Sequence, residues 1–374
     1  MANFKLVRIF MLILLSAFVF SSCIKDEAQN TEADIVSCTV DGNLLIRNPI
    51  ITNNEIRLYV NGWDDVTRVA PVFEITDGAT IEPASGTVRD FTTPQTYTVT
   101  SQDGQWKKTY TVSFISDDIA TNYHFENMKW YEDVNKWNPS AAPQKLFHVF
   151  YDTTIEGTNM EWGSGNAGYM ITNSSAPAES YPTSQSENGF VGKCVKLTTV
   201  STGALGAEFG APLAAGNLFL GTFEINLLNM AKSTHFGQPF RKMPQGLVGY
   251  YKYKAGEKYT DKNNAVVPKK KDEFDIYAVF YEVTDDVPYL DGTNSLTSDN
   301  IVLLARLTDK KETEEWTRFS IPFEAVDGRK VDAQKLKDGK YNLAIIMSSS
   351  KDGANFNGAV GSTLYVDEME LFYE

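Results

Sequence analysis

The sequence predicts an all-β protein, with an N-terminal immunoglobulin-like β-sandwich followed by a larger C-terminal jelly-roll β-sandwich. Three observations lead to this class. Runs rich in Thr, Val and Tyr alternate between apolar and polar residues, and clusters of Gly, Asn, Asp and Ser separate them. Aromatic residues make up 12% of the chain, which favours strands. Helical patterns are confined to two short stretches, residues 227–232 and 331–336.

The first 22 residues have the pattern of an export signal. Lys5 and Arg8 precede an apolar run over residues 9–20, and two serines end it. This run is too short to cross the hydrocarbon of a bilayer, which requires about 20 helical residues. We therefore predict a signal peptide over residues 1–22.

A cysteine follows the apolar run directly. Residues 20–23, Phe-Ser-Ser-Cys, resemble the bacterial lipobox, although Phe20 stands where leucine is usual. The resemblance implies a lipid on Cys23 and a lipidated tether over residues 23–32, because acyl chains hold a protein at a bilayer without a spanning helix. Residues 25–27, Lys-Asp-Glu, are similar to the export tag of Bacteroidetes surface lipoproteins; the alternative is an ordinary polar tether. The predicted location is the outer membrane, exposed at the cell surface.

Charge and cysteine usage exclude several classes of function. The net charge is −14, so the chain lacks the basic surface that nucleic acid requires. Cys38 and Cys194 are far apart and belong to no CxxC motif, which argues against a metal or redox cluster. Cys38 shares the apolar face of an alternating strand, so we predict a buried thiol there, with a disulfide as the alternative. The three histidines show no HExxH spacing, and no phosphate-binding glycine loop is present.

Residues 33–117 form the predicted immunoglobulin-like spacer domain. Ile56, Leu58 and Val60 share one face of an alternating strand. Two further alternating runs, residues 96–100 and 109–114, flank Asp103-Gly104, which is typical of a hairpin turn. Several short strands in about 85 residues favour a sandwich of this type. No chemical constellation is found here, so we assign the domain a spacer role.

Residues 118–374 form the predicted jelly-roll domain. Several of its strands are apolar on both faces: in residues 274–281, Phe274, Ile276, Ala278 and Phe280 alternate with a second apolar set. Such a strand is either covered on both faces or carries a ligand groove on one of them. These strands predict a two-sheet sandwich.

Four blocks carry a resemblance to a known family. They are AGNLFLGTF at 215–223, FGQPF at 236–240, GLVGYYKY at 246–253 and SSSKDGANFNGAVGSTLYVDE at 348–368. In this order they resemble the putative carbohydrate metabolism domain of Bacteroidetes surface lipoproteins, over roughly residues 120–374. The resemblance implies a jelly roll like those of carbohydrate-binding modules, and some members have been labelled glycoside hydrolases.

Aromatic residues supply the candidate sugar-binding plates, because sugars present apolar C–H faces and hydroxyl edges. In GYYKY, Tyr251 and Tyr253 share one face of a strand, and Tyr250 shares the other with Lys252. One pair must face away from the core unless both faces are covered, and a core role for all three tyrosines is the alternative.

A second candidate lies in a glycine-flanked segment. Trp162, between Glu161 and Gly163, is predicted in a loop where it could stack on a pyranose, with Asn166 as a hydrogen-bonding partner. The alternative is a tryptophan that closes the end of the sandwich. Arg241 could bind a uronate or a hydroxyl pair, or fix a loop through a carbonyl.

A structural calcium ion is the one cofactor considered. Carbohydrate-binding jelly rolls resemble one another in an early Phe-Glu pair and a late Val-Asp pair that share calcium. The matching residues here are Glu126 and Asp367, and calcium accepts such oxygen ligands. The alternative is a pair of solvated or hydrogen-bonded carboxylates. No cofactor is required.

The preferred function is noncatalytic capture of a polysaccharide or oligosaccharide, with an outer-membrane lipid anchor and neighbouring glycan-uptake proteins as partners. A glycoside hydrolase is the first alternative. It needs two carboxylates that flank the scissile bond, and Glu161 and Asp275 would be the candidates. A structural or adhesion lipoprotein is the second. These classes differ in a binding assay that also measures reducing ends.

Overall fold

The computed structural model describes residues 29–42, 44–62, 64–116, 118–133 and 142–374. The predicted signal peptide and Cys23 therefore lie outside the described residues. Within the described chain, no helix is long and apolar enough to span a membrane. The chain divides into two compact units. The first comprises the described residues up to 41, with 51–56 and 67–113; the second comprises 42–50, 57–66 and 114–374.

Most of the strands before residue 117 lie in the first unit. One sheet has the order β2-β3-β7-β6-β5, and β1 pairs with β4 as a second sheet. Their bounds are β1 Ile35–Thr39, β2 Ile50–Ile51, β3 Glu55–Val60, β4 Val72–Ile75, β5 Thr80–Glu82, β6 Gln95–Thr100 and β7 Lys107–Ser116. The predicted hairpin is confirmed, since β6 pairs with β7 and Gly104 takes a positive φ of 70°. Val99 and Val112 are fully buried, as alternation predicts.

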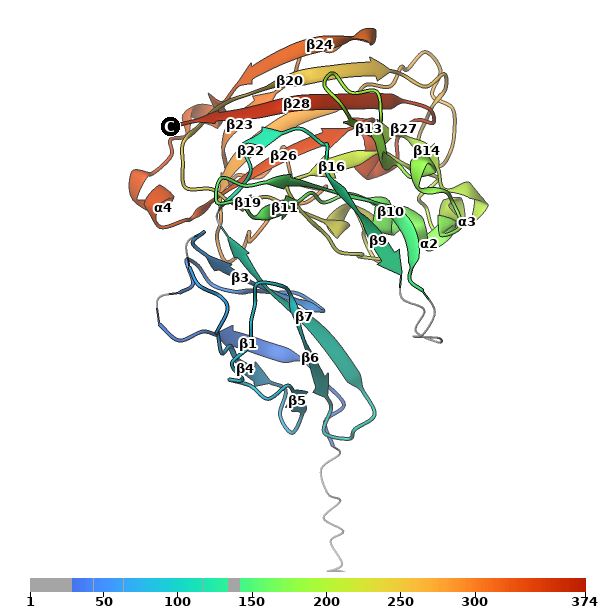
Figure 1. Ribbon diagram of the computed structural model, residues 1–374. Helices are drawn as coiled ribbons and strands as arrows, with labels where there is room; N and C mark the ends of the chain where they lie inside the picture. The colour runs from blue at the N-terminus through green and yellow to red at the C-terminus, as the bar shows by residue number, and fades with distance from the viewer. Residues whose placement is uncertain (1–28, 43, 63, 117, 134–141) are drawn as a thin grey trace, which may run out of the picture. The chain divides into compact units, whose positions relative to one another are not determined.

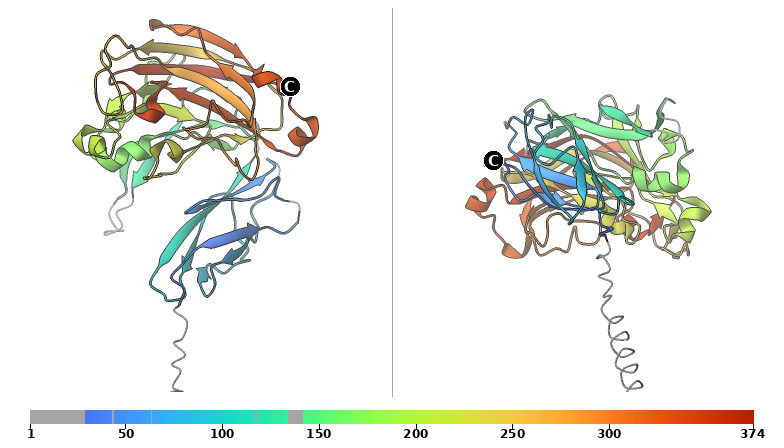
Figure 2. Two further views of the ribbon diagram at one scale, coloured as in Figure 1. Left: turned by 180° about the vertical axis from the view of Figure 1, so that it is seen from behind. Right: turned by 90° about the horizontal axis from the view of Figure 1, so that it is seen from below.

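The second unit contains two large antiparallel sheets that face each other across the main core (Figure 1). Sheet A has the order β12-β13-β28-β20-β24, with β8 paired to β28. Sheet B has the order β16-β26-β22-β23-β25, with β19 paired to β26. The view from behind shows the same two layers (Figure 2). The β-rich sandwich is thus confirmed, while the immunoglobulin-like and jelly-roll assignments stay predictions.

Long strands with alternating side chains form both sheets. The strands of sheet A are β8 Asn122–Tyr123, β12 Thr183–Ser186, β13 Cys194–Thr198, β20 Pro244–Lys254, β24 Thr313–Pro322 and β28 Thr363–Tyr373. Those of sheet B are β16 Asn217–Phe219, β19 Gln238–Pro239, β22 Asp275–Glu282, β23 Ile301–Arg306, β25 Glu324–Ala325 and β26 Tyr341–Ser348. Three further strands, β9 Met128–Asp133, β10 Gln144–Thr153 and β11 Asn159–Glu161, form a separate sheet.

Short elements connect these sheets. Strand pairs are β14 Val200–Ser201 with β15 Leu213–Ala214, β17 Gly221–Phe223 with β18 Thr234–Phe236, and β21 Tyr259–Thr260 with β27 Gly358–Ala359. The helices are α2 Asn166–Asn173, α3 Gly203–Glu208 and α4 Ala333–Lys337, with 3₁₀ turns at Ala178–Ser180, Met230–Ser233, Val326–Gly328 and Gly353–Asn355. The patterns at 331–336 and 227–232 correspond to α4 and to a 3₁₀ turn, whereas α2 and α3 were not predicted.

Strand β22 is covered on both faces, as its composition predicts. Ile276, Ala278 and Phe280 point into the main core between the sheets. Tyr277 and Val279 point to the other side of sheet B, into a second apolar cluster with Phe219 and Phe236 among others. The segments that cover this second face also leave a cavity against it.

The two cysteines of the described chain, Cys38 and Cys194, are free and buried.

Candidate functional site

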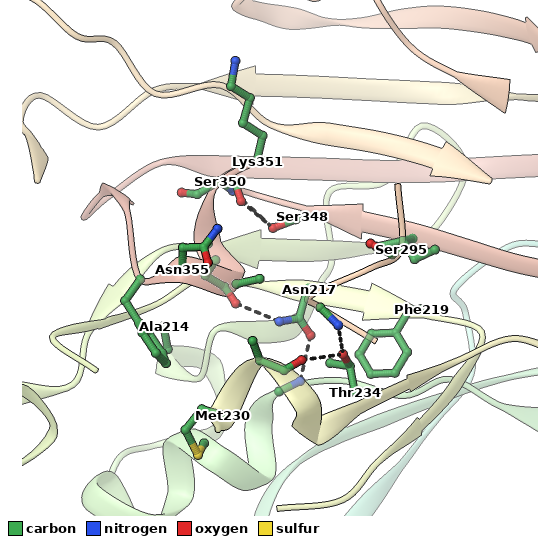
Figure 3. Close-up of a pocket in the computed structure, with 18 of the residues that line it drawn as sticks. Ala214, Asn217, Phe219, Met230, Thr234, Ser295, Ser348, Ser350, Lys351 and Asn355 are labelled. Atoms are coloured by element: carbon green, nitrogen blue, oxygen red, sulfur yellow. Dashed lines mark hydrogen bonds between the residues drawn. The ribbon is translucent and has the colours of Figure 1, made fainter. Parts of the chain in front are cut away.

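A pocket of about 330 Å³ lies on this second face of sheet B (Figure 3). Its floor is formed by the ends of three neighbouring strands, which contribute Asn217, Tyr277 and Ser348. Its walls come from α2, the segments 202–215, 223–236 and 291–297, and the turn at 350–356. The volume lies within the range of small-ligand sites.

The lining of the pocket is largely apolar. Its apolar side chains are Tyr169, Ala211, Leu213, Ala214, Ala215, Phe219, Phe223, Met230, Ala231, Phe236, Tyr277, Leu296, Ile346, Ala354 and Phe356. Gly168 lets α2 approach closely, because a Cβ there would lie 3.1 Å from the Phe223 ring. An apolar cavity with few polar groups is typical of sites that bind the faces of sugars or other small ligands.

Most polar groups at the floor are already paired. Asn217 accepts a hydrogen bond from the Gly165 amide at 2.8 Å and donates one to the Ala215 carbonyl at 3.2 Å (Figure 3). The Tyr277 hydroxyl lies 2.8 Å from that of Ser295, and burial raises the pKa of Tyr277. These bonds hold the floor in one arrangement before any ligand arrives.

Phe356 is the pocket residue with an unusual backbone. Its φ of 56° places it in the left-handed region, which costs about 1–2 kcal/mol for a residue with a Cβ. The strained conformation ends the 3₁₀ turn at Gly353–Asn355 and keeps the half-buried ring at the pocket. Strain of this kind concentrates at ligand sites. The neighbouring Asn355 is exposed at the same wall and can offer its amide to a ligand.

A buried carboxylate fastens this wall to the fold. Asp272 Oδ2 accepts hydrogen bonds from the hydroxyls of Ser350 at 2.5 Å and Ser362 at 2.7 Å, and from the Ala359 amide at 2.7 Å. Burial raises the pKa of Asp272, and these bonds oppose the rise. The first part of the block at 348–368, up to Phe356, therefore lines the pocket, and one acid from another segment holds Ser350 in place.

Trp162 is not an exposed sugar plate, which corrects the sequence prediction. It is 3% exposed, and its indole Nε1 donates to Asp152 Oδ2 at 2.7 Å. The glycine beside it serves close packing rather than exposure: the backbones of Gly163 and Phe219 exchange hydrogen bonds at 2.9 and 3.0 Å. A Cβ at Gly163 would lie 2.4 Å from the Phe219 ring.

Three other predicted binding residues are also buried. Tyr251 and Tyr253 point into the main core at 1% and 4% exposure, so neither can stack on a sugar. Asn166 is fully buried at the start of α2, where its amide bonds both ways with the Thr183 backbone at 2.8 and 3.0 Å. These side chains support the fold, because the tyrosines pack in the core and Asn166 pairs with the backbone.

Tyr250 and Arg241 lie elsewhere on the unit. Tyr250 is half-buried on the outer face of sheet A, opposite the core side of β20. Arg241 is half-buried, with its guanidinium against Gly339, where a Cβ would lie 3.1 Å from Nε. Neither residue lines the pocket.

The two candidate catalytic acids are not brought together in the pocket. Asp275 lines it but is 2% exposed and bound by Arg306 Nη2 and Lys310 Nζ, each at 2.6 Å. Glu161 does not line the pocket and pairs with Lys129. Among the described lining residues, Asp275 alone carries a carboxylate. Its two cationic partners occupy the lone pairs that acid–base chemistry would use.

Glu126 and Asp367 bind the same loop, residues 187–193. Glu126 Oε1 accepts from the Lys193 amide at 2.8 Å, and Asp367 Oδ2 accepts from the Phe190 and Val191 amides at 2.7 and 3.0 Å. Asp367 Oδ1 is buried without a hydrogen-bond partner. Within the described chain, no group of three or more His, Cys, Asp or Glu is placed to hold a metal. The orphaned oxygen is one that a cation would satisfy, and Glu126, which binds the same loop, is the other carboxylate that could hold it.

Sequence reasoning missed Phe356 and Asn355 as site residues. The signal that could have found them is the stretch DGANFNG, in which glycines and asparagines surround one aromatic residue. Such a composition indicates a turn with left-handed positions, and an aromatic side chain in that turn is a candidate plate.

Two family models match the chain. The sequence model of the family described as "Putative carbohydrate metabolism domain" matches residues 124–372, and the one described as "SGBP, N-terminal" matches residues 35–113. A search among curated proteins found no match.

Two solved structures are similar to this chain. A putative glycoside hydrolase from Bacteroides thetaiotaomicron is 48% identical with a TM-score of 0.76, and the match covers 94% of this chain and 99% of that one. A putative glycoside hydrolase from Bacteroides vulgatus is 42% identical with a TM-score of 0.62, covering 69% of this chain and 99% of that one.

Proposed function

Because this chain belongs to the putative carbohydrate metabolism domain family of Bacteroidetes, we propose that it binds a glycan at the pocket on sheet B without cleaving it. The observation that carries this proposal is the strained Phe356, whose ring is held at a mostly apolar cavity beside the exposed amide of Asn355. An aromatic plate and an amide are the groups that a pyranose face and its hydroxyls require.

The charge arrangement favours binding over hydrolysis. Glycoside hydrolysis uses two carboxylates, separated by about 5–5.5 Å or about 6.5–9.5 Å. Asp275 is the one acid among the described lining residues, and Arg306 and Lys310 neutralise it. The related structures carry the name glycoside hydrolase, so cleavage is the alternative that the test must include.

The match of the first unit to the SGBP N-terminal model supports a cell-surface glycan-binding role. We assign this unit an immunoglobulin-like fold and a spacer role, and the second unit a jelly-roll fold. A lipid on Cys23 would anchor the chain in the outer membrane, next to glycan-uptake proteins. Anchoring raises the local encounter rate with a polysaccharide without requiring tight binding at one site. Expression of Cys23→Ala should move the protein from the membrane to the soluble fraction.

Calcium is proposed as a structural ion at Glu126 and Asp367. It would satisfy the orphaned Asp367 Oδ1 and fix the loop 187–193 to sheet A. Added CaCl₂ should raise the melting temperature of the wild-type protein and have no effect on Glu126→Gln. If neither calcium nor a chelator changes the melting temperature of the wild-type protein, the calcium site is contradicted.

The function is tested by calorimetric titration of the purified protein with neutral oligosaccharides, with reducing ends assayed in parallel. We expect saturable binding without release, lost in Phe356→Ala and Asn355→Ala. Phe372→Ala is the matched control, since Phe372 is an exposed aromatic residue on β28 outside the pocket. Release of reducing ends would establish a hydrolase and direct attention to Asp275 and Glu161. Absence of binding and release would favour a structural or adhesion role.

A further inference from the structure

The outer face of sheet A carries a group of aromatic residues, of which Phe190 is exposed and Tyr250, Trp316 and Tyr365 are half-buried. On β20, Tyr251 and Tyr253 enter the core, so Tyr250 and Lys252 point outward. Lys252 stands directly opposite Tyr365 on β28. Beyond Tyr365, the register places Lys196 of β13 in the same row. Neighbouring strands are about 4.8 Å apart, so the two lysines begin about 10 Å apart on either side of one tyrosine.

The rings on this face form one connected surface. Phe190 stacks on Tyr250 with centroids 3.8 Å apart and 12° between the planes, and its edge faces Trp316 at 6.3 Å. Lys252 Nζ lies 4.5 Å from the centroid of the Trp316 ring and 5.3 Å from that of Tyr365. We name Phe190, Tyr250, Lys252, Trp316 and Tyr365 the aromatic face.

This surface is fixed by a buried group rather than by chance packing of a loop. Phe190 is 44% exposed, yet its backbone amide and that of Val191 donate to Asp367 Oδ2 beneath the loop. A large apolar ring held flat and open to solvent loses little conformational entropy when a flat ligand stacks on it. Preorganisation of this kind favours binding.

Three cations lie on the outer face of sheet A: Lys252, Lys196 opposite Tyr365, and Arg318 opposite Tyr250. Lys196, Lys252 and Arg318 make no ion pair within the described residues, whereas Glu187 at the rim pairs with Lys193 at 3.1 Å. Three such cations on a chain of net charge −14 are available to an anion. Exposed Glu314 and Glu315 precede Trp316 on β24, so an anionic chain would lie over β13, β28 and β20 instead.

We propose that the aromatic face binds an acidic polysaccharide, with Phe190 and Tyr365 stacking on sugar rings while Lys196 and Lys252 pair with carboxylate or sulfate groups. The site is separate from the pocket on sheet B and shares no residue with it. A chain with both sites would hold one polymer at two points, or two different glycans at once.

Affinity electrophoresis of the purified protein tests the proposal, in native gels that contain polygalacturonate, dextran sulfate or neutral dextran. We expect retardation by an acidic polymer and none by dextran; the polymer that retards identifies carboxylate or sulfate. Lys252→Ala should weaken the apparent affinity up to about fivefold through the lost charge. Phe190→Ala should weaken it about two- to tenfold through the lost stacking. Raised salt should weaken it further.

Lys242→Ala is the matched control, because Lys242 Nζ lies 4.2 Å from the Tyr373 ring at the other end of β20. This substitution also removes one positive charge and a lysine–aromatic contact, but outside the aromatic face. Equal effects of Lys242→Ala and Lys252→Ala, or an effect of Lys252→Ala without one of Phe190→Ala, would indicate simple charge attraction and overturn the proposal. Retardation by dextran, or by no polymer, would also overturn it. Phe356→Ala should leave the retardation intact, which separates this site from the pocket.

Discussion

The ring of Phe190 lies parallel to that of Tyr250, with 3.8 Å between centroids, and the backbone of Phe190 is held by Asp367. Asp367→Ala removes the buried carboxylate that accepts hydrogen bonds from two backbone amides, and a hydrogen bond to a charged group contributes about 1.5–3 kcal/mol. We expect a loss of this size in the free energy of unfolding, measured by denaturant titration, together with weaker retention on acidic polymers. Glu370→Ala, an exposed site on the same strand, should change neither quantity.

Two substitutions of Phe356 should differ in their effect on stability but have the same effect on ligand binding. Phe356→Gly relieves the positive φ, whereas Phe356→Ala keeps the strain and loses the same ring. The glycine variant should therefore unfold at higher denaturant concentration than the alanine variant, by about 1 kcal/mol. Both should lose affinity for the pocket ligand. At Phe372 in β28 the order should reverse, because glycine weakens a strand.

Trp162 should affect stability and not glycan binding. Trp162→Phe keeps most of the apolar volume but leaves Asp152 Oδ2 without its indole partner inside the fold. The expected loss is about 1–3 kcal/mol in the free energy of unfolding. Trp106, which is 64% exposed, is the matched site, and Trp106→Phe should be nearly neutral. Reduced glycan affinity in a folded Trp162→Phe protein would restore the sequence prediction.

Asp272 should couple stability to the shape of the pocket wall. Asp272→Ala leaves the hydroxyls of Ser350 and Ser362 and the Ala359 amide without their acceptor. We expect a loss of at least about 3 kcal/mol, because a buried charged acceptor is removed. Glu273→Ala is the adjacent control, since Glu273 is half exposed and should cost no more than about 1 kcal/mol. Equal losses in the two variants would contradict the role of Asp272.

His148 should make the protein less stable in mild acid. Burial lowers the pKa of His148, and its Nδ1 accepts the Gln185 amide at 3.0 Å, which requires the neutral ring. As pH falls through about 6.5, the unfolded chain takes up this proton and the folded chain resists it. The free energy of unfolding should decrease below pH 6.5, by up to about 1.4 kcal/mol per pH unit for this group. His148→Gln should reduce the change of the free energy of unfolding with pH. If that change stays the same, another group takes up the proton.

Alternation along β20 shows how far the sequence could predict the fold. It separated Tyr250 and Lys252 from Tyr251 and Tyr253, and the structure confirms that division. It could not decide which pair enters the core, because tyrosine suits both sides of a half-buried sheet. That choice depends on the opposing sheet, where Phe274 packs against Tyr251 and Tyr253 with centroids 4.9 and 4.7 Å apart.

The pocket was harder to predict because its parts come from segments far apart in the sequence. The glycines around Trp162 indicated a loose loop, yet Gly163 allows close contact with Phe219, and no local pattern distinguishes these two uses of glycine. Likewise, the family blocks could be recognised in the sequence. The hydrogen bond from Ser350 to Asp272, 78 residues away, forms only in the folded chain. Local patterns predicted the strands, and long-range packing determined the site.

The position of β28 has a consequence for biosynthesis. This strand pairs with β20 along one side and with β13 and β8 along the other, so it completes the middle of sheet A. Every other strand precedes it in the sequence. A nascent chain therefore cannot close sheet A until residues 363–373 have been synthesised, and any chaperone that meets the chain earlier finds an open sheet.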